Sequence, residues 1–218
     1  MNNNDILLYY NDEDPRHYAV LKIGANNGQC PNDNLFGKID GKLRCIFVEP
    51  VPRLYDQMVK YFDTTYPYNN FVYINKAVSS SVDKIKIYYP SRTNDFKQLP
   101  WWIDQLSGSN PQHFSDHGYT VDLDMSYIPT TTVNNICEEL KVNTLDYLTV
   151  DTEGHDYDIL MAVDLNKIKP TFISFEHLHM DGYKTQGEKY KRLLEYLENN
   201  GYSITSKDID NTTCKRVV

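Results

Sequence analysis

The sequence lacks the cysteine pattern and the basic runs that mark several common classes of protein. Its four cysteines, Cys30, Cys45, Cys137 and Cys214, are scattered and form no C-x-x-C pair. We therefore predict reduced thiols rather than a zinc site or a disulfide framework. The formal net charge is −8. Because phosphate binding needs concentrated Lys and Arg, this balance argues against a nucleic-acid partner and favours a neutral or cationic small substrate, or a sugar.

Long apolar runs are also absent. No segment approaches the ~18 continuous apolar residues of a membrane span, and the first residues lack the basic and apolar regions of a secretory signal. We therefore expect a cytoplasmic protein with no membrane partner. A chain of 218 residues buries a substantial core without disulfides or metals, so one domain is expected over residues 1–218. Residues 1–17 are predicted to form an N-terminal arm or lead-in helix.

A glycine turn follows the first apolar run, which covers residues 18–23. Gly24 and Gly28 allow tight backbone angles and leave N–H groups open to a ligand at the strand tip. The loop reads G-A-N-N-G, so it lacks the spacing of the G-x-G-x-x-G dinucleotide fingerprint. Its two asparagines suit a ligand with an amino-acid end and a ribose, such as S-adenosylmethionine. The alternative is a plain glycine-rich turn from strand to helix.

A second apolar run, over residues 44–48, ends in Glu49 and Pro50. A carboxylate at the tip of the neighbouring strand is what recognition of a ribose diol requires. Glu49 therefore favours a nucleoside-containing cofactor over a plain turn.

Strands and helices alternate along the rest of the chain, which is typical of a doubly wound parallel α/β sheet. Pro52 is expected to open a helix, because apolar residues follow it at helical spacing. Thr130–Thr132 predict the start of a second helix. The remaining expected elements are strands over 71–78, 84–89, 145–150 and 171–177, a helix holding Ile159, Leu160 and Val163, a helix over 190–200, and an edge hairpin from 202–205 and 213–217.

Residues 90–129 show no regular pattern, and long segments of this kind are usually functional or disordered. They contain both tryptophans of the protein, Trp101 and Trp102, which disfavours disorder. We predict a lid or substrate-binding insertion. The alternative is that the tryptophan pair only anchors the loop to the body of the protein.

The densest cluster of ionisable residues follows the apolar run 145–150 and reads Asp151-Thr152-Glu153-Gly154-His155. Such a position lies at the carboxyl end of a strand, where open α/β sheets bind their ligands. The cluster is therefore the predicted chemical centre.

Together these motifs resemble those of the FkbM-type methyltransferases, which use S-adenosylmethionine, in order from about residue 18 to the C-terminus. The D-x-E-G element behind a G-A-N-x-G loop is the most specific of them. The matching segments are Ile23–Gly28, Phe47–Pro50, Asn75–Val78, Thr130–Thr132, Val150–Gly154 with Ile159-Leu160, Phe175-Glu176 and Gly201-Tyr202.

The resemblance implies a fold and a set of roles. The expected fold is a Rossmann-like class I methyltransferase, with a doubly wound, mostly parallel seven-stranded sheet and an antiparallel edge strand. Asp151, Glu153 and His155 would face the transferred methyl group and the acceptor. The substrate residues would be Trp101, Trp102, His113 and Glu176. The cofactor residues would be Gly24, Ala25, Asn26, Asn27, Gly28, Glu49, Pro50, Asn75, Lys76, Ala77 and Asp151.

One position departs from the family pattern. Relatives usually carry an acidic residue two positions before the first glycine, where it helps to hold the methionine ammonium, and this chain has Lys22. Either Lys22 turns away and Asp151 compensates, or cofactor affinity is weakened.

The transferred carbon is already activated in a sulfonium, so the protein must align the acceptor oxygen and remove its proton. Alignment offers ~7–11 kcal/mol, more than the ~10²–10⁴-fold gain from a general base. Glu153 and His155 are the leading candidates for that base, followed by His177 and His113. Glu153 has the alternative role of capping the next helix.

A divalent ion held by Asp151, Glu153 and Glu176 is possible but not favoured. His177 and His179 would point to opposite faces of a strand, so at least one is expected to be structural.

The sequence thus predicts an S-adenosylmethionine-dependent O-methyltransferase acting on a hydroxyl of a sugar, glycan or related small metabolite. The alternatives are a methyltransferase for a protein or lipid-linked acceptor, and an inactive S-adenosylmethionine-binding module, of which Lys22 would be the sign. Neither the acceptor nor the oligomeric state is predicted.

Overall fold

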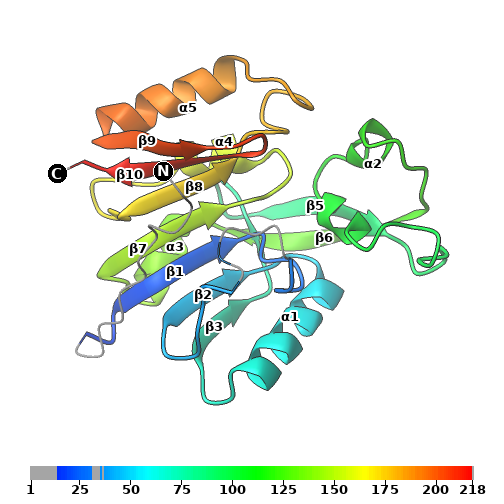
Figure 1. Cartoon of the computed structure of the whole chain (residues 1–218), viewed down its shortest axis with the longest axis horizontal. Coiled ribbons are helices and arrows are strands. Elements are labelled where there is room, and N and C mark those ends of the chain that lie inside the picture. The colour runs from blue at the N-terminus through cyan, green and yellow to red at the C-terminus, as the bar shows by residue number, and fades with distance from the viewer. Residues whose placement is uncertain (1–13, 31–34, 36, 218) are drawn as a thin grey trace.

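A computed structural model describes residues 14–30, 35 and 37–217, and its centre is a seven-stranded sheet with the order β3-β2-β1-β7-β8-β10-β9 (Figure 1). The strands of this sheet are β1 (His17–Ile23), β2 (Arg44–Val48), β3 (Asn70–Ile74), β7 (Thr144–Val150), β8 (Phe172–Glu176), β9 (Tyr202–Lys207) and β10 (Asn211–Arg216). The helices are α1 (Pro52–Thr65), η1 (Ile103–Leu106), α2 (His113–Asp116), α3 (Val133–Glu139), α4 (Asp156–Met161) and α5 (Glu188–Asn199).

The pairing of these strands confirms the predicted α/β sheet. β3, β2, β1, β7 and β8 pair in parallel, and the expected hairpin of β9 and β10 adds antiparallel pairs at one edge. The reversed strand is β10, which lies between β8 and the outermost strand β9. The carboxyl ends of β1, β2, β7 and β8 therefore share one edge of the sheet, where open α/β folds bind ligands.

Apolar side chains cover both faces of the sheet. One core packs residues of β1, β7 and β8 against α3, α4 and α5. The other packs residues of β1, β2 and β7 against Met58 and Phe62 of α1. The central strands are buried on both faces, which explains why they read as continuous apolar runs rather than as alternating patterns.

Local signals place two helices as the sequence predicts. α1 begins with Pro52 at its first turn and buries Leu54, Met58 and Phe62. α3 begins after Thr132, whose side chain accepts a hydrogen bond from the Asn135 backbone N–H at 3.0 Å. This N-cap is the reason that the threonine run starts a helix.

The predicted strand over residues 71–78 is wrong as one element. It divides into β3 and the two-residue strand β4 (Ala77–Val78), which joins a second sheet of order β4-β6-β5. β5 (Lys84–Pro90) confirms the strand expected there. Its antiparallel partner β6 (Leu123–Thr131) includes residues 123–129, which were expected to lack regular structure. The strand-free part of the insertion is thus shorter than predicted.

The insertion lies beside the ligand edge of the main sheet. Figure 1 shows β5 and β6 on the side toward which β1, β7 and β8 point, with α2 beyond them. Arg53 of α1 ties this segment to the body, because its guanidinium pairs with Asp104 of η1 and donates to the Pro90 carbonyl at 2.8 Å.

Some sequence predictions fall wholly or partly outside the described residues. The expected N-terminal arm over 1–17 is described only from residue 14, and β1 already begins at His17. Residues 31–34 and 36, which follow the glycine turn, also lie outside the described residues. The four cysteines are all free, as predicted. Among the described residues, no helix is both long and apolar enough to cross a membrane.

We predict that Arg53→Ala loosens the insertion without unfolding the sheet. Asp104 and the Pro90 carbonyl would lose their charged partner, so the local free energy of opening should fall by about 1–3 kcal/mol. Amide hydrogen exchange would show faster exchange in residues 91–122 and unchanged exchange in β1 and β7. Arg92→Ala, at an exposed position of the same segment, is the control. Equal acceleration in both variants would contradict this role for Arg53.

Candidate active site

The turn after β1 is held against the end of β7. Gly24 has φ +77°, and a Cβ added to it would lie 1.7 Å from the Asp151 carbonyl oxygen. Its N–H and that of Ala25 both donate to the Val48 carbonyl at 3.0 Å. Only glycine fits here, because both the backbone angle and the space exclude a side chain. The glycine turn, the end of β2 and the end of β7 are thereby fixed next to one another.

Glu49 connects that turn to the end of β2. Its Oε2 accepts a hydrogen bond from the Asn26 N–H and its Oε1 accepts one from the Val51 N–H, both at 2.8 Å. An ionised carboxylate has about four acceptor positions, so two remain for a ligand hydroxyl. Burial raises the pKa of Glu49 to about 7, although the two backbone hydrogen bonds and nearby Lys22 act in the opposite direction.

The loop after β7 holds the acidic cluster in a strained conformation. Glu153 has φ +56°, a left-handed value that costs a residue with a side chain some energy and recurs at functional sites. Asp156, fully buried at the start of α4, accepts hydrogen bonds from the Thr152 N–H and hydroxyl and from the Glu176 N–H. Asp156 thus holds the end of β8 against the loop that carries Glu153.

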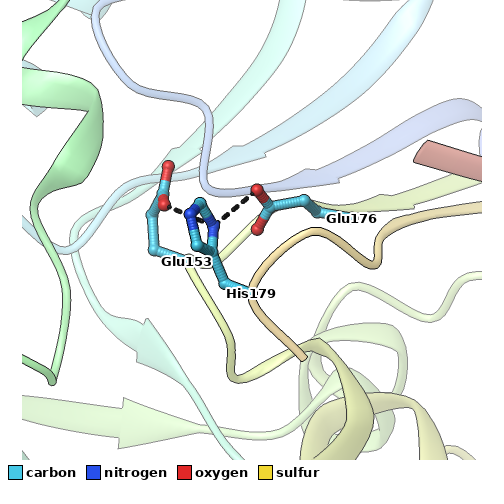
Figure 2. Close-up of side chains that lie close together, drawn as sticks. All are labelled: Glu153, Glu176 and His179. Carbon is cyan, nitrogen blue, oxygen red and sulfur yellow. Dashed lines mark hydrogen bonds and ion pairs between the residues drawn. The ribbon is translucent and has the colours of Figure 1, made fainter. Parts of the chain in front are cut away.

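Glu153, Glu176 and His179 form one buried cluster (Figure 2). Nδ1 of His179 lies 2.8 Å from Glu176 Oε1 and 3.0 Å from Glu153 Oε2. Burial raises the pKa of both carboxyl groups. Burial also disfavours the charged imidazole of His179, but its hydrogen bonds with Glu153 and Glu176 outweigh this effect and raise its pKa.

Two histidines of the insertion, His113 and His117, pack against His179 of this cluster. The ring of His113 stacks on that of His179 with centroids 4.9 Å apart, and burial lowers the pKa of His113 to about 4. Nε2 of His117 lies 3.0 Å from Nε2 of His179. The insertion is therefore held to the sheet edge at two places, by the contacts of Arg53 and by those of His113 and His117 with His179.

All these segments surround a cavity of about 500 Å³, a size typical of small-molecule sites. One side is formed by the turn after β1, the end of β2 and residues 76–78. The opposite side is formed by the acidic loop and by residues that follow β8. The insertion supplies a third wall, which includes Trp102, Gln105 and Ser107–Ser109.

Most of the predicted site residues share this cavity. Both predicted cofactor positions at the strand tips, Gly24 and Glu49, lie on it together with the acidic loop. The predicted site residues that line the cavity are Gly24, Ala25, Asn26, Glu49, Pro50, Lys76, Ala77, Trp102, Asp151, Glu153, His155 and Glu176.

Several predicted cofactor and substrate residues lie elsewhere. Gly28 faces the Phe62 ring, where an added Cβ would come within 2.9 Å, so it serves helix packing. Asn75 donates from Nδ2 to the Glu49 carbonyl at 2.8 Å and supports the strand end from behind. Trp101 is 67% exposed and does not line the cavity, in contrast to Trp102. Asn27 is also absent from the lining; its side chain accepts a hydrogen bond from the Gln29 N–H.

His177 was predicted as a catalytic residue, and its position does not support that role. The chain leaves β8 at Glu176, and Nδ1 of His177 lies 3.1 Å from the Thr212 hydroxyl of β10, away from the cavity lining. Its ring packs near Tyr190 of α5. His177 and His179 follow the end of β8, so the strand alternation expected for them does not apply, although His177 lies against β10 and α5 and His179 lies beside Glu153 and Glu176.

The sequence interpretation also left two histidines out of the site. His179 takes the place beside Glu153 and Glu176 that had been assigned to Asp151, and His117 supports it. The spacing Glu176-x-x-His179 was the available signal, because a turn after a strand tip brings such residues together. The capping role considered for Glu153 is not seen: the residue before α4 is His155, and Glu153 faces His179.

Lys22 does not turn toward solvent. Its residue is 6% exposed and lines the same cavity as Gly24, Glu49 and Asp151. The lysine is close enough to Glu49 to lower the pKa of that carboxyl group. A buried cation therefore takes part in the electrostatics of the cofactor side of the cavity.

Comparison with known proteins yields one family. The sequence model of the FkbM methyltransferase domain matches residues 22–204. The structure is similar to the FkbM methyltransferase of Methylobacillus flagellatus KT, with a TM-score of 0.53 and 13% identity over 91% of this chain and 43% of that chain. It is also similar to an O-methyltransferase from Bacillus cereus in complex with SAH, with a TM-score of 0.48 and 10% identity over 90% of this chain and 73% of that one. No curated protein matches the sequence.

We predict that Gly24→Ala lowers stability by more than strain alone explains. The new methyl group would meet the Asp151 carbonyl at 1.7 Å and would have to push β1 and β7 apart. Gly118→Ala is the matched control, because Gly118 also has a positive φ, of +82°, but has nothing within 4 Å of an added Cβ. That control should cost only about 1–2 kcal/mol of unfolding free energy. Urea denaturation giving equal losses would contradict the close approach at Gly24.

Proposed function

Because the chain belongs to the FkbM methyltransferase domain family, we propose that it transfers a methyl group from S-adenosylmethionine to a hydroxyl of a sugar, glycan or related small metabolite. The observation that carries this proposal is that Gly24 and Glu49 line the same cavity as Glu153 and His155. Methyl transfer needs groups that bind the ribose of the cofactor at one end of the cavity, and acidic and basic side chains that bind and deprotonate the acceptor at the other end.

The cofactor side supports binding of the adenosyl group. Glu49 retains acceptor positions for ribose hydroxyls, and its two hydrogen bonds with backbone N–H groups hold the carboxylate in place. Lys76 and Ala77, beyond β3, line the adjoining part of the cavity and would lie near the adenine. Asp151 is the carboxylate at the tip of β7 and would face the methionine ammonium in place of the acid that position 22 lacks.

The opposite side supports binding and deprotonation of a hydroxyl. His155 lines the cavity with its Nδ1 3.4 Å from the Ser109 hydroxyl, so the insertion orients its ring. The Glu153 carboxylate is paired with His179, whereas the imidazole of His155 has only the contact with Ser109 among the described hydrogen bonds. We therefore propose that His155 accepts the proton of the acceptor hydroxyl and that Glu153 orients the acceptor.

The sugar assignment rests on the composition of the cavity lining away from the glycine turn. Trp102 and Tyr183 line the cavity beside Gln105, Ser107 and Asp210, so aromatic faces stand next to hydrogen-bonding groups. Polyhydroxylated rings suit such a mixture, because their apolar faces stack and their hydroxyls need partners. A panel of nucleotide sugars and free sugars, assayed for release of S-adenosylhomocysteine, tests this class against protein and lipid-linked acceptors.

We predict that Glu49→Gln weakens binding of S-adenosylmethionine by about 10- to 100-fold, since a hydrogen bond to a charged group contributes ~1.5–3 kcal/mol. The pKa of Glu49 is raised to about 7, so the carboxylate forms as pH rises through this value. Affinity of the parent protein should therefore increase across about pH 7 and level off above it, and this step should vanish in Glu49→Gln. Calorimetry over a pH series measures both effects.

The Gln variant binds the same ligand, so any titration of the ligand itself would remain in both proteins and cancel in the comparison. Parent protein that shows no thermal stabilisation by S-adenosylmethionine would contradict the proposal, because ligand at ~100 times its dissociation constant adds about 2.7 kcal/mol. Binding without methyl transfer to any acceptor class would leave the binding-module alternative, for which buried Lys22 is the structural sign.

We predict that His155→Gln lowers kcat by about 10²- to 10⁴-fold, the range for loss of a general base, and leaves cofactor affinity unchanged. His177→Gln is the matched control, because that histidine lies outside the cavity lining and should retain parental turnover. Rates come from S-adenosylhomocysteine release with the best acceptor of the panel. A larger loss in the His177 variant than in the His155 variant would reverse the assignment.

A further inference from the structure

The cluster of Glu153, Glu176 and His179 has the composition and shape of a metal-binding site. One potential ligand atom from each residue lies within 4.8 Å of the others, and Figure 2 shows the imidazole between the two carboxylates. The three residues come from two neighbouring strand ends, since Glu153 follows β7 and Glu176 ends β8. All three line the cavity, so an ion bound there would be accessible to a ligand in it.

Besides Oε2 of Glu153, which lies 3.0 Å from His179 Nδ1, two buried polar atoms in or beside this cluster have no hydrogen-bond partner among the described residues. They are Oε2 of Glu176, in a residue 7% exposed, and Nδ1 of His113, in a residue 6% exposed. Nδ1 of His113 lies 4.0 Å from Glu153 Oε2, too far for a hydrogen bond but directed toward the same carboxylate. Leaving such groups unsatisfied costs about 1–3 kcal/mol each, so their presence together calls for a ligand.

The cluster also contains more hydrogen-bond acceptors than donors. Two carboxylates offer about eight acceptor positions, whereas Nδ1 of His179 offers at most one proton to them. A cation that accepts electron pairs from oxygen and nitrogen corrects this imbalance.

The surroundings of His179 fit a ligating histidine. A metal-bound imidazole usually donates its second N–H to a nearby acceptor, which fixes the ring and its tautomer. Nε2 of His179 has such a neighbour in Nε2 of His117 at 3.0 Å. With Nε2–H donated to His117, the Nδ1 lone pair points between the two glutamates.

We propose that Glu153, Glu176 and His179 bind a divalent first-row transition metal ion. A nitrogen donor beside two carboxylates favours ions such as Mn²⁺ or Zn²⁺ over Mg²⁺ and Ca²⁺, which prefer shells of oxygen alone. Binding of the ion stands independently of the proposed methyl transfer. If that transfer also holds, the ion lies on the acceptor side of the cavity, where it would polarise the acceptor hydroxyl.

The test is direct metal binding in the absence of S-adenosylmethionine. The full chain is stripped with a chelator, desalted and titrated with Mn²⁺, with free Mn²⁺ measured by electron paramagnetic resonance, and in parallel with Zn²⁺ by calorimetry. We expect one equivalent to bind and the melting temperature to rise. Addition of Co²⁺ should produce an absorption band in the visible range that Zn²⁺ removes, which reports coordination by the protein itself.

Variants distinguish the residues that would bind the ion from residues that only lie near it. Glu176→Gln and His179→Gln conserve shape and should lower affinity by more than the 10- to 100-fold that loss of an outer partner costs. His117→Phe, which removes only the outer partner of His179, should fall within that range. His177→Gln, a buried histidine outside the cavity, should bind like the parent protein. Circular dichroism establishes that each variant is folded.

Failure of the parent chain to bind either ion at millimolar concentration would overturn the proposal, as would affinities unchanged in the Glu176 and His179 variants. In either case His179 would act as an imidazolium paired with the two carboxylates. Stabilisation of the parent protein by S-adenosylmethionine is measured separately, so failure of the metal site and failure of the methyl-transfer proposal are distinguishable.

Discussion

The close approach of the ends of β1 and β7 is the constraint on which the cavity depends. Gly24 leaves no room for a side chain against the Asp151 carbonyl, so the glycine turn after β1 and the loop that carries the acidic cluster start next to each other. From this point the cavity lining extends on one side to Glu49, at the tip of β2, and on the other side to Glu153, near the end of β8. Because both directions are set by hydrogen-bonded strands, the two sides of the cavity are placed before any ligand arrives. A small shift at Gly24 would therefore move both sides at once.

The insertion adds a third wall to this edge of the sheet, and polar groups hold it there. Gly108 pairs with Tyr88 of β5 and passes next to Glu153, where an added Cβ would lie 3.3 Å from the glutamate Cβ. His117 reaches His179 from the same segment. Polar groups excluded from water strengthen one another electrostatically, but each unsatisfied one is costly. The insertion therefore does more than line the cavity, because it also influences how strongly the buried carboxylates and imidazoles interact.

The sequence was sufficient for the main sheet, the family and most of the cavity lining, because these depend on short-range signals. The strands of a parallel sheet that is covered on both faces read as continuous apolar runs. The runs that end before Gly24 and Glu49 therefore show where β1 and β2 end. The match of the FkbM methyltransferase domain over residues 22–204 confirms the resemblance that those tips carry. Long-range contacts were not predictable. The exposed face of β6 breaks the apolar pattern near Pro129, and nothing local shows that His113 would stack on a ring 66 residues further along the chain.

Lys22 shows how one unexpected charge fits the remaining electrostatics. Burial drives Glu49 toward its neutral form, and Asp151 adds repulsion in the same direction, whereas Lys22 favours the ionised carboxylate. An acid at position 22 would join Asp151 in opposing ionisation, although it would attract a ligand ammonium. With lysine there, the ionised form of Glu49 is favoured, and in the proposed binding mode the attraction of a ligand ammonium would be left to Asp151. In the proposed binding mode, Lys22 would thus shift positive charge toward the ribose end of the ligand, where it stabilises the ionised carboxylate of Glu49.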